Sequence, residues 1–327
     1  MTETNLFIID EESNSARIFF IVPFHLFLSV QRAKIEYDTH PLALIKNEID
    51  RRSVIVGSAA LLSTFLLQPP LKVFAVDGIN ERSVVSSLKV VTDPETYSAL
   101  SYAPTNGTDN ENTPLILVLH GAGKNDQDIF QDLGNPIGEH AGLIPSLIAS
   151  NMGPTNLLDN FCVLAPYSFG KQSFYGEPRQ KLLKFVEWAI QNQNTEALPL
   201  KFDPKRIILF GFSDGATVAV ELLTTKRFAA GVVCSYGYNG KALPSQALER
   251  LKNIPIWVFH SKDDVIFDVQ NSDRLVQQLE TVNSEKGIIK YSRYNTDPEN
   301  LPPRVRGHSM GITASKSTEL YDWLLDI

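Results

Sequence analysis

The segment Arg206–Leu223 constrains the fold of this chain more than any other part of its sequence. Its residues are RIILFGFSDGATVAVELL, in which an apolar run passes directly into helical spacing. Ser213 stands at that junction, with Gly211 and Gly215 two places to either side. The pattern predicts a strand, a sharp turn at the serine and a helix, because side chains at the two glycine positions would collide in such a turn.

The remainder of the chain from residue 87 onward alternates short apolar runs with helical patterns. Such alternation predicts an α/β fold, with a mostly parallel sheet covered by helices on both faces. Reactive groups of such sheets gather at the carboxyl ends of the strands. Strands are expected at residues 87–91, 97–103, 114–123, 160–168, 206–212, 229–237, 254–261 and 287–295, and helices at 181–193, 214–225, 272–282 and 312–325.

Composition excludes several classes of protein. With 43% hydrophobic and 20% charged residues, the chain has an ordinary globular composition. Its length of 327 residues suits one large α/β domain with extra sequence, or two small domains. A net charge of -7, with no Lys/Arg run longer than two, argues against a nucleic-acid partner. The two cysteines, Cys162 and Cys234, lie in apolar runs without metal-site spacing, so no metal is predicted.

Residues 1–75 are interpreted as a targeting presequence, and residues 76–327 as the folded domain. Arg51 and Arg52 precede the uncharged run 53–67, and Val73-Phe74-Ala75 has the small residues of a cleavage site. The segment 51–75 therefore resembles a twin-arginine export signal and is too short for a comfortable membrane span. A membrane anchor and a buried helix are the alternatives. Its late position suits a presequence that ends in a plastid thylakoid lumen; a periplasmic or secreted protein with a misplaced start codon would look the same.

A serine hydroxyl becomes a nucleophile only beside a base, and that base needs an orienting acid. In this architecture the chain order is serine, acid, histidine. Of the six histidines, only His308 lies beyond the acidic pair Asp263–Asp264, which follows the strand at 254–261. The candidate catalytic residues are therefore Ser213, His308 and one of the two aspartates.

The oxyanion formed by attack on a carbonyl needs backbone N–H donors. One is expected from Asp214, the residue after the serine. The second is assigned to Ala122 in the segment LHGAG, where Gly121 and Gly123 let the backbone approach closely. A plain turn at the end of a strand is the alternative for this segment, and His120 is expected to be structural.

At these residues the sequence resembles the α/β-hydrolase fold, most closely the phospholipase/carboxylesterase group with the related predicted-peptidase and polyhydroxyalkanoate-depolymerase-like esterases. The matching segments run in order from residue 114 to 325: PLILVLHGAG, NFCVLAPYS, FDPKRIILFGFSDGA, RFAAGVVCSYG, IPIWVFHSKDD, GHS and LYDWLL. The resemblance implies Ser213 as nucleophile, Asp264 as acid in preference to Asp263, His308 as base and Ala122 in the oxyanion hole. The acid motif is usually HGxxD, and Ser261 here replaces its glycine.

The resemblance also implies a function: an exported serine carboxylesterase acting on a small-molecule ester, without a metal or organic cofactor. A serine peptidase of the same fold and a non-catalytic binding protein are the alternatives. The sheet order of the family would place two strands between the strand of Cys162 and the strand of Cys234. The two cysteines would then be about 14 Å apart, beyond the reach of a disulfide, so free thiols are expected. The connection between the strands at 229–237 and 254–261 is too short for a large lid. Loop aromatics either line an acyl pocket or pack on the sheet: Tyr167, Phe169, Phe174, Tyr175 and Tyr238.

Overall fold

The computed structural model describes residues 6–10, 15–19, 88–104, 111–170, 173–237, 242–283, 287–299 and 301–327. The chain divides into two compact units, residues 1–78 and 79–327. In the first unit, β1 (Leu6–Asp10) pairs antiparallel with β2 (Ser15–Phe19). The twin-arginine-like segment 51–75 lies outside the described residues. Among the helices that are described, none has the length and hydrophobicity needed to cross a membrane.

The second unit is built on an eight-stranded open sheet with the order β10-β9-β8-β7-β5-β6-β4-β3. β4 pairs antiparallel with β3 and with β6, and the pairs from β6 through β10 are all parallel. Every strand expected between residues 87 and 295 is present, and the predicted α/β architecture is confirmed. The strands are β3 (Lys89–Thr92), β4 (Ser98–Tyr102), β5 (Leu115–Leu119), β6 (Cys162–Pro166), β7 (Ile207–Phe212), β8 (Ala230–Cys234), β9 (Ile256–Ser261) and β10 (Ile289–Tyr294).

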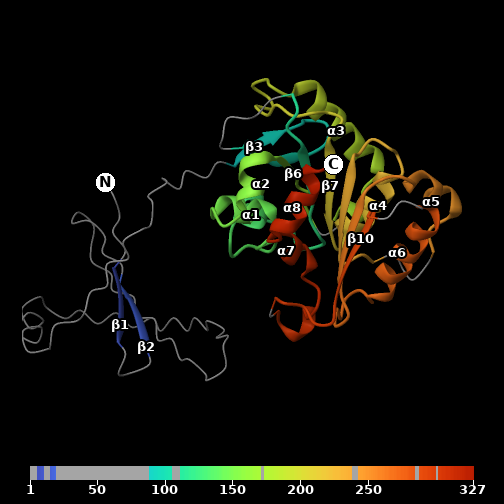
Figure 1. Cartoon of the computed structure of the whole chain (residues 1–327). Helices are drawn as coiled ribbons and strands as arrows, with labels where there is room; N and C mark the ends of the chain where they lie inside the picture. The colour runs from blue at the N-terminus through green and yellow to red at the C-terminus, as the bar shows by residue number, and fades with distance from the viewer. Residues whose placement is uncertain are drawn as a thin grey trace, which may run out of the picture. The chain divides into compact units, whose positions relative to one another are not determined.

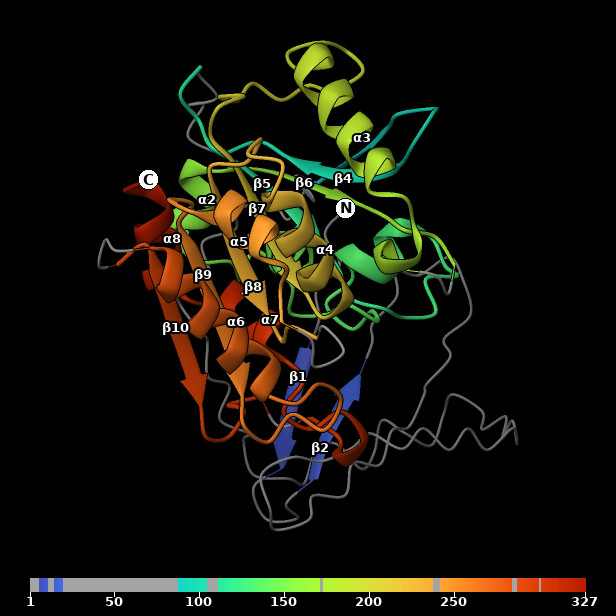
Figure 2. The same ribbon diagram turned by 90° about the vertical axis from the view of Figure 1, so that its right-hand side faces the viewer.

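Helices cover both faces of the sheet (Figure 1). One face carries α1 (Ile144–Ala149), α2 (Thr155–Asn160), α7 (Met310–Ser315) and α8 (Thr318–Leu325). The other carries α3 (Arg179–Asn192), α4 (Asp214–Leu223), α5 (Ser245–Leu251) and α6 (Gln270–Val282), which lie in front of the sheet in Figure 2. Short non-α turns of helix lie at Phe130–Gly134, Phe174–Gly176 and Pro303–Val305.

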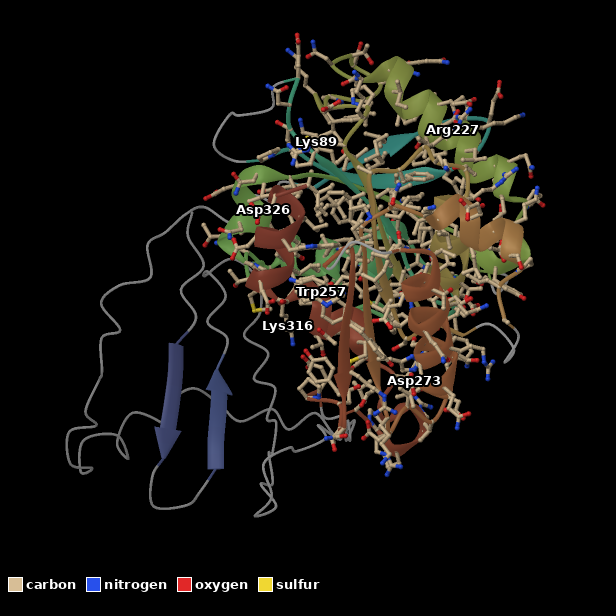
Figure 3. All side chains as sticks on the ribbon, turned by 45° about the vertical axis from the view of Figure 1, so that its right-hand side comes forward. Lys89, Arg227, Trp257, Asp273, Lys316 and Asp326 are labelled. Atoms are coloured by element: carbon tan, nitrogen blue, oxygen red, sulfur yellow. The ribbon has the colours of Figure 1, made fainter. Side chains whose placement is uncertain are left out.

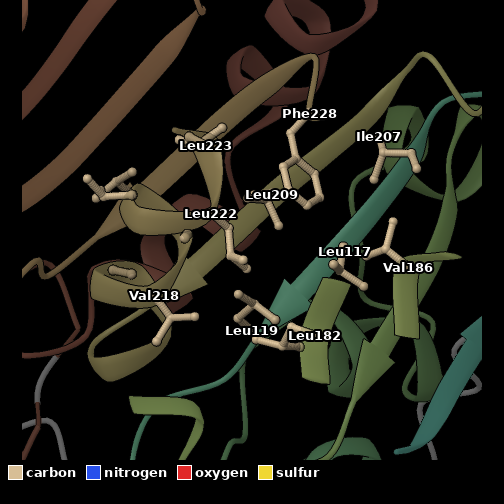
Figure 4. Packing of buried hydrophobic residues seen from close by; sticks show 14 of the residues in the cluster. Leu117, Leu119, Leu182, Val186, Ile207, Leu209, Val218, Leu222, Leu223 and Phe228 are labelled. Atoms are coloured by element: carbon tan, nitrogen blue, oxygen red, sulfur yellow. The ribbon is translucent and has the colours of Figure 1, made fainter. Parts of the chain in front are cut away.

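The core follows from the two-residue period of the strands. In β5, Leu117 and Leu119 join the cluster beneath α3 and α4, where they pack near Leu182 and Leu222 (Figure 4). Ile116 and Val118, which alternate with these leucines, join the cluster on the opposite face. Because both faces are covered, all five residues of β5 are apolar and buried, as a central parallel strand requires.

The opposite cluster extends to the far end of the sheet. Trp257 of β9 lies on the side of α7 and α8 (Figure 3) and meets Trp323 with ring centroids 5.3 Å apart. On the strands nearer the centre, Cys162 of β6 and Cys234 of β8 are separated by β5 and β7, as the family sheet order implied. Both cysteines are buried, and neither forms a disulfide.

The predicted closing helix at 312–325 is wrong in one respect, because it is two helices. Ser317 has an extended backbone, and its hydroxyl accepts a hydrogen bond from the Leu320 N–H at the start of α8. A serine cap of this kind competes with continuation of the preceding helix. Helices α1, α2 and α5 were not predicted, since six or seven residues are too few to establish a helical period.

The parallel strands direct their following loops to a single edge of the sheet. The loops after β5, β6, β7, β8 and β9 all carry candidate site residues, and the connection from β8 to β9 contains α5 within its described part. This edge is therefore where the candidate site is assembled.

Candidate active site

Ser213 occupies the turn between β7 and α4 in a backbone conformation that few non-glycine residues adopt. Its φ is 55° and its ψ is -122°, and its N–H donates to the carbonyl of Cys234 at 2.9 Å. A β-carbon on Gly211 would lie 2.5 Å from the Gly215 carbonyl oxygen, and one on Gly215 would lie 2.2 Å from that of Leu119. The turn predicted from the sequence is present, and both glycines are required by close backbone contacts.

Ser213, His308 and Asp264 lie in one line of hydrogen bonds. His308 Nε2 lies 2.8 Å from Ser213 Oγ, and His308 Nδ1 lies 2.8 Å from Asp264 Oδ2. The carboxylate oxygen can only accept, so Nδ1 carries the hydrogen and Nε2 is left to accept from the serine hydroxyl. Only 10% of the His308 side chain and none of the Asp264 side chain is exposed, so the acid end of this line is shielded from water.

Asp264 is held as a carboxylate by the donors around it. Burial opposes its charge, but hydrogen bonds from His260 and His308 outweigh that effect and lower its pKa from 3.8 to about 2. Its second oxygen, Oδ1, accepts from the backbone N–H groups of Ile266 at 2.8 Å and Phe267 at 2.9 Å. The acid is therefore charged and fixed before any substrate arrives.

The neighbouring Asp263 belongs to a different network. Its Oδ1 accepts from the hydroxyl of Ser261 at 2.6 Å and from the N–H of Asp297 at 3.0 Å. Its Oδ2 lies 3.9 Å from Arg306 Nε. The structure thus brings Asp264, and not Asp263, to His308. Ser261, which departs from the usual glycine of the motif, helps to hold Asp263 in its own network.

The loop that bears His308 is fixed on both sides of the histidine. Gly307 has a φ of +77°, and a β-carbon there would lie 2.2 Å from the backbone nitrogen of Asp264. On the other side, the N–H and hydroxyl of Ser309 both donate to the carboxylate of Asp297, at 3.1 and 2.6 Å. Gly307 lets the loop that bears His308 pack against the loop that bears Asp264, and Asp297 fixes the orientation of the His308 loop through Ser309.

Two phenylalanines enclose the His308 ring. Phe212 and Phe267 lie with their ring centroids 5.4 and 5.3 Å from that of the imidazole. Neither was singled out from the sequence. Phe212 is the residue before Ser213 in the turn, and Phe267 follows Asp264 by three residues. Their closeness in the sequence to these two site residues is the signal that could have identified them.

The loop after β5 approaches Ser213 closely. A β-carbon on Gly121 would lie 3.0 Å from that of Ser213, so a side chain at this position would crowd the serine. His120 Nδ1 donates to the carbonyl oxygen of Gly121 at 2.7 Å. In a planar trans peptide the C=O and N–H point in opposite directions, so the N–H of Ala122 points away from His120. Within the described residues, neither this N–H nor that of Asp214 has a hydrogen-bond acceptor.

Residues beyond the motif hold this loop in place. Glu139 Oε2 accepts from the N–H groups of Lys124 at 2.8 Å and Asn125 at 3.2 Å. His140 Nε2 lies 3.0 Å from the side-chain oxygen of Asn125. Burial lowers the pKa of His120 well below its ordinary value and also lowers that of His140, so both rings are neutral. No spacing in the sequence marked Glu139 or His140.

The aromatic residues expected near the site divide into two groups. Phe174 is fully buried in the core cluster beneath α3 and α4, and Tyr167 is buried in the cluster on the opposite face, with its hydroxyl on Asp132. Phe169 and Tyr175 are 69% and 45% exposed on the loop after β6. Tyr238 lies outside the described residues.

The same loop is tied to the turn at Ser213. The Ser173 hydroxyl donates to Asp214 Oδ2 at 2.8 Å. The carboxylate of Asp214 also lies in the first turn of α4, where the helix dipole favours a negative charge. In the described part of the chain, no group of three His, Cys, Asp or Glu side chains is arranged to hold a metal ion.

Comparison with known proteins agrees with the sequence resemblance. A family model described as Phospholipase/Carboxylesterase matches residues 167–300, which include Ser213 and Asp264. No match was found among curated protein sequences. Together with the sheet described above, the match confirms the α/β-hydrolase fold and the resemblance to this family.

The same fold is found in a solved structure with a TM-score above 0.5. A thermostable esterase superposes with a TM-score of 0.57 at 24% identity, over 74% of this chain and 64% of that protein, just under two thirds of its length. The carboxylesterase Cest-2923 from Lactobacillus plantarum WCFS1 gives a TM-score of 0.49 at 15% identity, over 73% of this chain and 97% of that one. MGS-M1, an α/β-hydrolase enzyme from a Medee basin deep-sea metagenome library, gives 0.48 at 16% identity, over 73% and 98%.

Proposed function

We propose that the protein is a serine hydrolase that cleaves carboxylic esters of small molecules through an acyl-enzyme on Ser213. The observation that carries the proposal is the continuous hydrogen-bonded line from Ser213 Oγ through His308 to the buried carboxylate of Asp264. A hydroxyl at a strained strand-to-helix turn, paired with a neutral imidazole nitrogen, is the arrangement that makes serine nucleophilic.

In the first step Ser213 Oγ attacks the ester carbonyl carbon while its proton passes to His308 Nε2. The imidazolium that forms is stabilised by Asp264, whose carboxylate also keeps the ring in the tautomer with hydrogen on Nδ1. The carbon–oxygen bond to the alcohol then breaks, and the proton on Nε2 leaves with the alcohol. Ser213 is left acylated.

In the second step water takes the place of the alcohol. His308 Nε2 accepts a proton from the water as its oxygen attacks the acyl carbon, and the proton returns to Ser213 Oγ when the acid departs. All the proton transfers pass through one nitrogen, and the protein ends in its starting state.

The negative oxygen of each tetrahedral intermediate is assigned to the N–H groups of Ala122 and Asp214. Both lack an acceptor among the described residues, and the first is oriented by the hydrogen bond from His120 to the preceding carbonyl. Fixed donors of this kind stabilise the charge without reorganising as it forms.

We infer that the site takes small or soluble esters. The described part of the connection between β8 and β9 holds only the short helix α5, which supports an open site without a large lid. Hydrolysis rates for a series of p-nitrophenyl esters should exceed those for emulsified long-chain triglyceride. The opposite order would refute this preference.

A fluorophosphonate probe and intact-mass measurement on the full chain test the proposed chemistry. One adduct is expected on the wild type and none on Ser213→Ala. Ser245→Ala, which changes an exposed serine outside the site, serves as the control and should be labelled normally. An ester panel follows, with the matching amides beside it. A folded wild type that takes no adduct would refute the proposal in favour of a binding protein, and equal cleavage of amides would favour a peptidase.

For residues 1–75 we propose a targeting presequence removed before Val76, with residues 76–327 as the mature hydrolase. The support is the twin-arginine-like segment of the sequence, and the thylakoid lumen is the proposed destination. N-terminal sequencing of the protein isolated from its own cells should begin at or near Val76. Unchanged processing after both Arg51→Lys and Arg52→Lys would contradict a twin-arginine signal.

A further inference from the structure

His260 is a fully buried histidine at the end of β9, and it contacts the acid of the site directly. Its Nε2 lies 3.2 Å from Asp264 Oδ2 and 3.0 Å from the carbonyl oxygen of Phe267. Its Nδ1 lies 2.7 Å from the hydroxyl of Ser272 in the first turn of α6. No part of the His260 side chain is exposed, so these contacts account for all of its polar atoms.

The partners determine where the ring carries its hydrogen. Asp264 Oδ2 and the carbonyl of Phe267 are both acceptors, so His260 Nε2 must be the donor. In the neutral ring Nδ1 is then an acceptor, and the Ser272 hydroxyl, which can donate, supplies its hydrogen. The two acceptors at Nε2 therefore set the tautomer of His260, and the Ser272 hydroxyl satisfies the other ring nitrogen.

This contact completes the coordination of the acid. Oδ2 of Asp264 receives hydrogen bonds from two imidazoles, His308 and His260, and Oδ1 receives two from the backbone. Two donors on each oxygen fix the rotation of the carboxylate as well as its position. Without His260, His308 would be the only side chain that the structure shows donating to Oδ2.

We propose that His260, held in place by its hydrogen bond with Ser272, is a positioning residue that fixes Asp264 for its contact with His308. The inference rests on the proposed function, because it assigns His260 a part in activating Ser213. A residue that only filled space behind the acid would need neither a donor at Nε2 nor a hydroxyl at Nδ1.

Two substitutions at one position separate hydrogen bonding from packing. His260→Gln keeps an N–H donor near the place of Nε2, whereas His260→Met keeps much of the volume without a donor. For the full chain, His260→Met should lower kcat for a p-nitrophenyl ester, and the rate of fluorophosphonate reaction at Ser213, about tenfold with KM unchanged. His260→Gln should stay within about threefold of the wild type, and Ser272→Ala should lose about threefold or more.

A control variant removes a buried hydrogen bond far from Ser213 in the sequence, to separate a loss of stability from a loss of activity. Asn283 is buried, accepts from the Asn253 N–H at 2.7 Å and lies at the other end of α6, so Asn283→Ala should lower Tm and leave kcat unchanged. Equal losses in His260→Gln and His260→Met would overturn the proposal in favour of packing. A His260→Met variant with the kcat of the wild type would also overturn it. If His260→Met does not fold, a Ser272→Ala variant with the kcat of the wild type would overturn the proposal instead. A wild type that takes no probe would instead refute the proposed function.

Discussion

Asp263 and Asp264 are adjacent in the chain, yet their carboxylates lie in separate hydrogen-bond networks. Asp264 contacts His308 and His260, whereas Asp263 contacts Ser261 and the backbone of Asp297. The division follows from the loop after β9, in which the hydroxyl of Ser261 donates a hydrogen bond to the carboxylate of Asp263. Two identical side chains thus receive different tasks from their surroundings.

Substitution of the two aspartates should therefore have unequal effects. Asp264→Asn can no longer favour the imidazolium of His308, and kcat for an ester should fall at least about a hundredfold. Asp263→Asn should keep kcat within about threefold, because its partners shape the loop and do not contact the histidine. Steady-state kinetics on both purified variants measure the difference. Equal losses would show that the separation of the two networks has no functional consequence.

The charge of Asp264 predicts how stability depends on pH. Its pKa is about 2 in the folded protein and 3.8 when unperturbed, so the unfolded chain takes up the proton first as the pH falls. The resulting stabilisation is fully present above about pH 5 and is lost between there and about pH 2. It amounts to about 2 kcal/mol. Urea unfolding of the wild type and Asp264→Asn should show their difference in unfolding free energy falling by that amount over this range. A constant difference would contradict the prediction.

Gly215 should tolerate no side chain. In Gly215→Ala the new β-carbon would meet the backbone carbonyl of Leu119 at 2.2 Å, which cannot move without displacing β5. We expect the free energy of unfolding to fall by about 3 kcal/mol, more than alanine adds through helix propensity. Gly153→Ala is the control, since its β-carbon would meet only the flexible ends of leucine side chains at 3.3 Å or more. Denaturant unfolding that ranks the two variants equally would show that the close contact relaxes.

The hydrogen bond from His120 to Gly121 should affect the reaction through Ala122. His120→Asn places a donor near the position of Nδ1, whereas His120→Leu removes it and frees the peptide between Gly121 and Ala122 to rotate. We expect His120→Leu to lower kcat about tenfold or more and His120→Asn to lower it less. Steady-state kinetics with Tm as a check on folding measure both effects. The same kcat in both variants would mean that the imidazole only fills space.

Both thiols should be unreactive in the folded protein. Cys162 and Cys234 are fully buried, and burial raises the pKa of the Cys234 thiol well above its usual value, which disfavours the reactive thiolate. A thiol reagent such as DTNB should therefore detect none in buffer and two in denaturant. An intact mass two daltons below that of the reduced chain would contradict free thiols.

The local pattern of the sequence was sufficient for the elements that are long and regular. The strands β5, β7 and β9 are continuous apolar runs, and the turn at Ser213 is marked by two glycines whose absence of side chains has a direct steric cause. These features depend on neighbours in the chain, so they can be predicted from it. The short helices α1, α2 and α5 lack enough turns to show a period.

The closing helix shows how local competition limits such a prediction. Residues 312–325 have helical spacing throughout, but the hydroxyl of Ser317 begins a new helix by bonding to the Leu320 N–H. The spacing of apolar residues predicts which face is buried. It does not decide whether a serine continues one helix or caps the next.

The reactive groups and their order along the chain, namely Ser213, the acidic pair and His308, could be read from the sequence alone. Which aspartate meets the histidine was decided by the tertiary structure, because Ser261 and Asp297 together hold Asp263 elsewhere. The same is true of His260 and Glu139, whose partners lie on other loops. Hydrogen bonds act over about 3 Å, and only the folded chain brings loops from different strands within that distance.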